Sequence, residues 1–254
     1  MPKKEDTNLE VMRHSYAHIL ALAVKELWPE TKMAIGPAIE NGFYYDFDFG
    51  KIKIKEEDLA KIEKKMKHII KKNLKFEKQE LNISEALKKE KKLGEIYKQE
   101  LIQDFKKDPL IGSGGSGEKK VFYYKLGDFE DLCRGPHVES SGKLNKDSFK
   151  LERIAGAYWK GDEKNKMLTR IYGIAFDTKK ELDNYLKIIE EAKKRDHRKL
   201  GKELDLFCFS DLVGPGLPMY TPKGVTIIDQ LRKHVEEICG NYGFEKVMTP
   251  HLSK

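Results

Sequence analysis

Apolar residues recur at helical spacing near the start of the chain. They form one side of a predicted helix, made up of Val11, Ile19, Leu20, Ala23 and Leu27. Thr7 or Asn8 can cap the start of this helix, and Pro29 helps to end it. The pattern therefore predicts an amphipathic helix, packed through its apolar side, within the first thirty residues.

The pattern then changes from helical to alternating. We expect strands at Met33–Ile39 and Phe43–Phe49, joined by Asn41-Gly42, a pair that favours a two-residue hairpin turn. The second strand alternates between two faces, one with Tyr44, Asp46 and Asp48 and the other with Tyr45, Phe47 and Phe49. Such alternation predicts a strand that is buried on one face only.

Helical spacing returns in the middle of the chain. Glu56–Leu74 is a predicted amphipathic helix whose inward residues are Leu59, Ile62, Met66, Ile69 and Ile70. Asn82–Glu85 resembles a capping box, which opens a helix to about Leu93, and residues 95–104 are predicted to be helical. Residues 106–120 contain GSGGSG and predict a mobile loop, because the lysine–hydroxyl ending of a phosphate-binding loop is missing.

Four further apolar runs predict strands, at Val121–Tyr124, Phe129–Leu132, Phe149–Ala157 and Met167–Phe176. A second capping box at Thr178–Glu181 opens a long helix to about Lys194. A short strand after Asp205, a helix over about Val225–Tyr242 and a strand at Phe244–Met248 complete the prediction. We therefore expect an α+β protein with antiparallel sheet and flanking helices.

Composition and charge narrow the class of protein. No apolar run approaches the ~20 residues that span a bilayer, and the first residues lack the apolar core of a secretory signal. Three widely separated cysteines do not make a disulfide framework, so we expect a cytoplasmic protein. Between Lys51 and Lys107 lie 18 lysines and 11 acidic residues, an excess equal to the net charge of +7. This stretch is either a solvated surface or a contact for a phosphate backbone.

Two pairs of residues at i, i+4 spacing are candidates for a functional site. His14 and His18 lie one helical turn apart, so both imidazoles project from one side of the first helix. Cys133 and His137 have the same spacing around Gly135-Pro136, which favours a tight loop. If the pairs converge, they could form a zinc site or a hydrolytic pocket.

The sequence around these pairs resembles the editing region of bacterial-type threonyl-tRNA synthetases. The stretches that carry the resemblance are MRHSYAHILALAVKELWPETKMAIGPAIENGFYYD (Met12–Asp46), GDFEDLCRGPHV (Gly127–Val138) and AGAYWKGDEKNKMLTRIY (Ala155–Tyr172). The two pairs alone would also fit alanyl-tRNA synthetases and their free-standing editing relatives. The likeness continues through RDHRKLGKELDLF (Arg195–Phe207) and GPGLPMYTPKG (Gly214–Gly224) to YGFEKVMTPHL (Tyr242–Leu252), which is similar to the first class II motif.

The resemblance implies three parts. They are an editing domain over 1–176, a linker helix over 177–200 and the opening fragment of a class II catalytic domain over 201–254. The resemblance does not extend to the small ubiquitin-like domain that precedes the editing helix in the family, nor to the second and third class II motifs and the anticodon-binding domain, so we expect these parts to be missing. The sites for ATP, Mg and the synthetic-site zinc belong to those missing parts. We therefore expect this chain to edit but not to charge tRNA, with seryl-tRNA(Thr) as its substrate.

The resemblance also suggests roles for single residues. His14 or His18, with His137, would orient the attacking water and the terminal ribose, and Lys98 matches a lysine that the family places in the pocket. Tyr45 matches a tyrosine that lines the site. Asp131 would face the same way as Cys133 on a strand, where it could bind the substrate ammonium or fix an imidazole tautomer. Cys133 would shape the pocket as a thiol.

The sequence is compatible with a site that binds zinc and with a site that does not. The threonyl branch resembles a metal-free site, whereas its alanyl relatives bind zinc, for which His14, His18, Cys133 and His137 would be the ligands. Three hypotheses follow: a threonyl-type editing esterase, a zinc-dependent alanyl-type editing protein acting on tRNA(Ala), or a non-catalytic tRNA-binding fragment. The partners implied are the acceptor end of tRNA(Thr) and, through the first class II motif, a second copy of the chain.

Overall fold

The computed structural model describes residues 8–107, 120–214 and 216–249. The chain is divided into two compact units, with the boundary between Tyr185 and Leu186. The predicted α+β class is confirmed, because helices and antiparallel strands share the chain. No helix in the described part of the chain is both long and apolar enough to cross a membrane.

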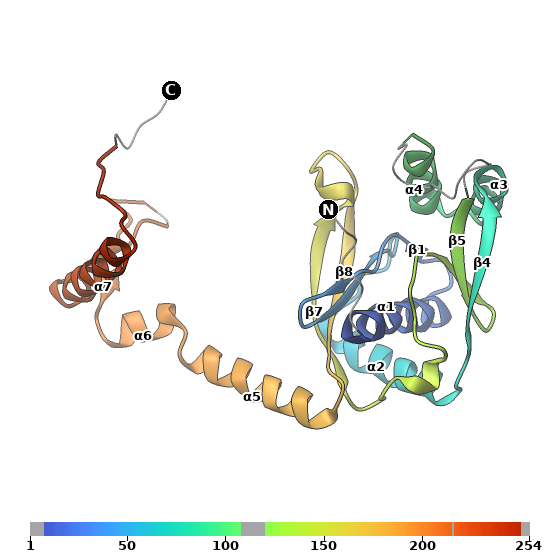
Figure 1. Ribbon diagram of the computed structural model, residues 1–254, viewed down its shortest axis with the longest axis horizontal. Helices are drawn as coiled ribbons and strands as arrows, with labels where there is room; N and C mark the ends of the chain where they lie inside the picture. The colour runs from blue at the N-terminus through green and yellow to red at the C-terminus, as the bar shows by residue number, and fades with distance from the viewer. Residues whose placement is uncertain (1–7, 108–119, 215, 250–254) are drawn as a thin grey trace. The chain divides into compact units, whose positions relative to one another are not determined.

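The first unit holds two antiparallel sheets (Figure 1). The five-stranded sheet has the order β1-β3-β8-β7, with β2 also paired to β3; its strands are β1 (Lys32–Met33), β2 (Ala38–Ile39), β3 (Gly42–Asp48), β7 (Phe149–Tyr158) and β8 (Met167–Ala175). The three-stranded sheet consists of β4 (Phe76–Asn82), β5 (Lys120–Leu126) and β6 (Phe129–Leu132). Helices and two short 3-10 turns, Ser141–Lys143 and Trp159–Gly161, complete the unit.

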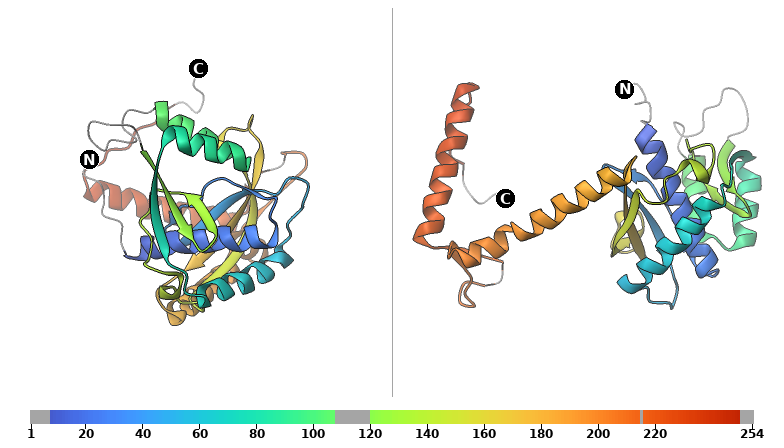
Figure 2. Two further views of the ribbon diagram at one scale, coloured as in Figure 1. Left: turned by 90° about the vertical axis from the view of Figure 1, so that its right-hand side faces the viewer. Right: turned by 90° about the horizontal axis from the view of Figure 1, so that it is seen from below.

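Helix α1 (Asn8–Leu27) lies between the two sheets, with α2 (Glu56–Lys71) beside it (Figures 1 and 2). Because it is covered on several sides, α1 buries twelve of its twenty residues, from Met12 to Val24 with the exception of His14. The sequence predicted the helix but only one packed side. In α2, by contrast, all five residues predicted to face inward are buried.

The predicted hairpin forms, but with two corrections. The first strand is broken into β1 and β2, and the turn residues are Glu40-Asn41, so that Ile39 pairs with Gly42. Gly42 is the first residue of β3, where an added Cβ would lie 2.0 Å from the carbonyl oxygen of Gly173 on β8. The glycine is therefore needed for the close approach of two strands and not for the turn.

Strand β3 is buried on both faces, whereas its alternating pattern predicted one. Asp46 is only 3% exposed because it accepts two hydrogen bonds from Arg170, at 2.6 and 2.8 Å. Asp48 is 8% exposed and accepts hydrogen bonds from Lys166 Nζ and Tyr97 Oη, both at 2.7 Å. Paired carboxylates can be buried in this way, and a hydropathy pattern does not reveal their partners.

The helices after β4 begin and end close to their predicted positions. Helix α3 (Ile83–Leu93) follows the predicted capping box, in which the Glu85 carboxylate accepts a hydrogen bond from the Asn82 N–H. Helix α4 (Ile96–Lys107) follows directly. The GSGGSG loop prediction falls on residues 108–119, which lie outside the described residues. Strand β4 has no apolar alternation and was not predicted.

The second unit, described by itself, is thinly packed. Helix α5 (Lys179–Lys194) starts at the predicted capping box, since Thr178 and Glu181 exchange two hydrogen bonds, and it crosses the boundary between the units. Then follow α6 (His197–Glu203), the paired strands β9 (Phe207–Cys208) and β10 (Met219–Tyr220), and α7 (Pro222–Asn241). The strand predicted at Phe244–Met248 is wrong: these residues have no regular structure, and β9 and β10 pair with each other.

Candidate functional site

The two i, i+4 pairs converge, although more than a hundred residues separate them. His14 and His18 project from α1, while Cys133 and His137 come from the segment that follows β6. One ligand atom from each of the four residues lies within 4.8 Å of all the others. Cys133 Sγ is 3.2 Å from His14 Nε2 and 3.3 Å from His137 Nε2.

The geometry of the loop after β6 explains why Cys133 and His137 meet. The Cys133 N–H continues the sheet by donating to Phe122 O at 3.0 Å, and the chain then turns at Gly135, whose φ is +72°. An added Cβ at Gly135 would lie 2.2 Å from Tyr124 Oη, so a side chain is excluded there. The Gly135-Pro136 peptide bond is cis. This turn brings His137 back over Cys133, as the glycine–proline pair predicted.

Aromatic side chains hold the His137 ring in place. Phe76 of β4 stacks on it with ring centroids 4.8 Å apart and an interplanar angle of 9°, and Tyr124 of β5 meets it edge-on at 4.4 Å. The ring of His18 lies 4.3 Å from the same imidazole, and that of His14 lies 4.4 Å away. Sequence reasoning missed Phe76 and Tyr124, because nothing in their local pattern separates them from core aromatics.

A buried polar network adjoins the imidazoles. Lys98 Nζ contacts Asp131 Oδ1 and donates to Tyr45 Oη at 3.1 Å, and Tyr45 Oη donates to Asp131 Oδ2 at 2.6 Å. All three residues are at most 3% exposed. His18 Nδ1 is 3.8 Å from Asp131 Oδ2, which is too long for a hydrogen bond. The structure thus gathers all seven predicted site residues, and Asp131 is already bound to Lys98 and Tyr45.

Burial sets the protonation states at neutral pH. Desolvation, helped by His14 and Lys98, lowers the pKa of His18 well below its usual 6.5. Burial likewise lowers the pKa of His137 far below 6.5, and burial raises the pKa of Cys133 to about 12. At neutral pH, His18 and His137 are therefore neutral imidazoles beside a thiol that keeps its proton.

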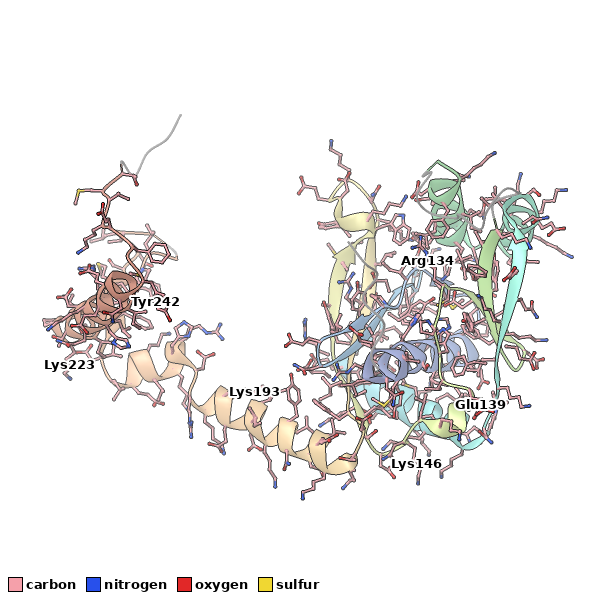
Figure 3. The ribbon with its side chains drawn as sticks, viewed as in Figure 1. Arg134, Glu139, Lys146, Lys193, Lys223 and Tyr242 are labelled. Atoms are coloured by element: carbon pink, nitrogen blue, oxygen red, sulfur yellow. The ribbon has the colours of Figure 1, made fainter. Side chains whose placement is uncertain are left out.

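Two features border the network and the loop. A pocket of about 790 Å³ reaches Lys98 and Asp131 from the side of Leu22 and Leu126, and the four converging residues do not line it. The exposed Arg134, between Cys133 and the turn, lies near α4 (Figure 3), where its guanidinium is 4.9 Å from the centre of the Phe105 ring. Arg134 thus places a positive charge one residue from Cys133.

The four converging residues fit a zinc ion in chemistry and spacing. Three imidazoles and one sulfur form a donor set that tetrahedral zinc accepts. With bonds of roughly 2.0–2.3 Å, tetrahedral ligands lie about 3.5 Å apart, close to the 3.2 and 3.3 Å that separate Cys133 Sγ from its two imidazole neighbours. The other separations range up to 4.8 Å, so small side-chain shifts would close the site.

Comparison with known proteins connects this site to a family. Residues 122–172 match the family model described as the threonyl and alanyl tRNA synthetase second additional domain. The chain is 52% identical over 241 residues to a threonine–tRNA ligase of Clostridioides difficile, which covers 95% of the chain and 36% of the relative. A threonine–tRNA ligase of Gloeobacter violaceus is 47% identical over 252 residues, covering 99% of the chain and 38% of the relative. The chain thus spans little more than a third of the length of these curated relatives.

Proposed function

The chain belongs to the threonyl-tRNA synthetase family, and from this premise we propose that its first unit is a proofreading esterase that hydrolyses seryl-tRNA(Thr). The observation that carries the proposal is the convergence of three imidazoles beside a buried lysine. Serine lacks one methyl group of threonine, and a missing methyl in a binding pocket gives only about 10–200-fold discrimination. A separate hydrolytic site supplies the remaining accuracy.

Hydrolysis of the ester requires three chemical functions from the site. A water must be oriented and must lose a proton as it attacks the carbonyl carbon, the developing oxyanion must be stabilised, and the ribose oxygen must regain a proton as the carbon–oxygen bond breaks. We assign both proton transfers to His14 or His18, together with His137. The products are free serine and tRNA with an intact 3′-terminal ribose.

Lys98 is the group that we assign to the oxyanion. Its ammonium is buried at 3% exposure, and a charge in such surroundings acts more strongly than in water. The contacts with Asp131 and Tyr45 fix the direction in which the ammonium points. Cys133 keeps its proton at neutral pH, so it shapes the pocket and does not form an acyl intermediate.

The experiment is a deacylation assay of the chain with seryl-tRNA(Thr) and threonyl-tRNA(Thr). We expect release of serine well above the spontaneous rate, and much slower release of threonine. Equal rates for the two substrates would contradict proofreading, and binding of tRNA without deacylation would identify the non-catalytic fragment instead.

The four-donor cluster also favours a second candidate, a zinc-dependent alanyl-type editing protein. In that case His14, His18, Cys133 and His137 would hold zinc, which would supply Lewis-acid chemistry for hydrolysis of the ester. Stoichiometric zinc in the purified chain, together with faster deacylation of seryl-tRNA(Ala) than of seryl-tRNA(Thr), would replace the first candidate by the second.

A further inference from the structure

Ser15 lies between the two histidines of α1 and is completely buried. Its hydroxyl makes three contacts. Ser15 Oγ is 2.8 Å from Val11 O, one turn earlier in the helix, and 3.0 Å from the backbone nitrogen of Val138. It is also 3.2 Å from His137 Nδ1.

The roles of two contacts are fixed by chemistry. A carbonyl oxygen only accepts, so the single hydroxyl proton of Ser15 goes to Val11 O, and a backbone N–H only donates, so Val138 N–H uses one hydroxyl lone pair. One lone pair is left, and it faces His137 Nδ1. An attractive contact there requires a proton on Nδ1, because two lone pairs at 3.2 Å would repel each other.

We propose that Ser15 is a positioning residue that holds His137 as the Nδ1–H tautomer and thereby leaves Nε2 unprotonated toward Cys133. The tautomer follows from the contacts of Ser15 alone, and its effect on hydrolysis rests on the proposed function. A neutral imidazole carries one ring proton, so fixing it on Nδ1 decides what the other nitrogen can do.

The tautomer of His137 determines its contact with Cys133. His137 Nε2 lies 3.3 Å from Cys133 Sγ, which accepts the Gly135 N–H at 3.2 Å and carries one proton of its own. That thiol proton can be donated to the lone pair of Nε2. An unprotonated Nε2 is also what a proton acceptor or a metal ligand must present, so Ser15 prepares His137 for either candidate chemistry.

The tautomer can be observed directly by long-range ¹H–¹⁵N correlation spectra of the full chain with ¹⁵N-labelled histidine, treated with a chelator at neutral pH. The His137 signals are assigned by their loss in His137→Ala. We expect a protonated Nδ1 and an unprotonated Nε2 in the wild type. A proton on Nε2 in the wild type would overturn the proposal, whatever the variants show.

Ser15→Ala tests the cause, and Ser141→Ala is the matched control. Ser141 is also completely buried, donates to Ile69 O at 3.2 Å and accepts the Leu74 N–H at 2.9 Å, but these partners are backbone groups and not an imidazole. We expect Ser15→Ala to move part or all of the His137 population to Nε2–H, and Ser141→Ala to leave it unchanged. An unchanged His137 pattern in a folded Ser15→Ala chain would contradict the proposal.

Deacylation of seryl-tRNA(Thr) gives the functional readout. We expect Ser15→Ala to lower kcat by about 10–100-fold, the usual effect of removing a group that orients a functional histidine. Ser15→Thr keeps a hydroxyl that can bond the same carbonyl one turn back, so it should restore both the tautomer and the rate. A wild-type chain without deacylase activity would refute the proposed function and leave the tautomer result standing.

Discussion

The two units of the chain differ in how far their apolar side chains are buried. The first unit buries Tyr16, Phe43 and Phe47 completely, because α1 and α2 pack against the five-stranded sheet. In the described part of the second unit, Leu212 is 99% exposed and Met248 is 98% exposed, and α7 leaves Leu231 and Val235 more than half exposed. One unit is a folded core and the other is a set of elements with apolar sides uncovered.

The candidate site lies in the unit that has the buried core. The seven predicted site residues belong to α1, β3, α4, β6 or the segment that follows β6, all within the first unit. The site residues are positioned by side chains that are themselves fixed by the core, such as Phe76 under His137. We therefore infer that hydrolysis depends on the stability of the first unit and is indifferent to substitutions in the second.

A pair of matched isoleucine substitutions should give the largest difference between the units. Ile62→Ala removes a side chain that is fully buried in α2 and should lower the free energy of unfolding of the first unit by about 2–5 kcal/mol. Ile227→Ala in α7, where the side chain is 45% exposed, should change stability by less than about 0.5 kcal/mol. Urea denaturation followed by circular dichroism measures both, and similar losses would remove the distinction.

Lysine substitutions should show the same difference between the two units in the rate of deacylation. Lys98→Ala removes the buried ammonium and should lower kcat for seryl-tRNA(Thr) by about 10²–10³-fold, a typical loss for an oxyanion-stabilising group. Lys223→Ala in α7 should leave the rate unchanged. Single-turnover deacylation measures this, and a Lys98→Ala chain that stays folded and active would exclude Lys98 from the mechanism.

His18 and His137 predict how the stability of the first unit depends on pH. Their pKa values are lowered on folding, so below pH 6.5 the unfolded chain binds protons that the folded chain does not, and stability falls as pH falls. The limit for two such groups is about 2.7 kcal/mol per pH unit.

Variants in each unit isolate this effect. After removal of metal, His18→Gln should reduce the slope of unfolding free energy against pH by up to one proton. His234→Gln, at an exposed position in α7, should leave the slope as it is in the wild type. Unfolding midpoints measured between pH 5 and 7.5 test this, and parallel slopes for wild type and His18→Gln would show that His18 is not buried in its neutral form.

Removal of metal has the smallest expected effect. If neutral imidazoles and Lys98 carry out hydrolysis, a chelator should leave the deacylation rate of the chain unchanged. Loss of activity with the chelator, restored by added zinc, would show that the four-donor cluster works as a metal site.

Much of the site could be predicted because the sequence spacing of its residues determines how they are arranged in space. Two histidines at i, i+4 must share a side of α1, and Gly135-Pro136 between Cys133 and His137 predicted the turn that closes the loop. Spacing says nothing about residues whose role depends on contacts across the fold. Ser15, Phe76 and Tyr124 each touch His137 from different elements, so no local pattern distinguishes them.

The elements that were predicted wrongly share a physical cause. Asp46 and Asp48 are buried because partners elsewhere neutralise them, and β4 forms because β5 pairs with it, although its own sequence is polar. Phe244–Met248 is apolar enough for a strand but is not paired with a strand in the described part of the second unit. A strand depends on its neighbour, whereas a helix such as α2 satisfies its own backbone and is visible in the sequence.

The most direct test of the proposed hydrolytic site is the rate at which the intact chain releases serine from seryl-tRNA(Thr), compared with the rate of the His14→Ala variant. We expect rapid release by the wild type and a loss of at least about 10²-fold in the variant, the contribution expected of a proton-transferring residue. Release at only the spontaneous rate by the wild type, or an equal rate in the folded variant, would contradict a hydrolytic site built from the converging histidines.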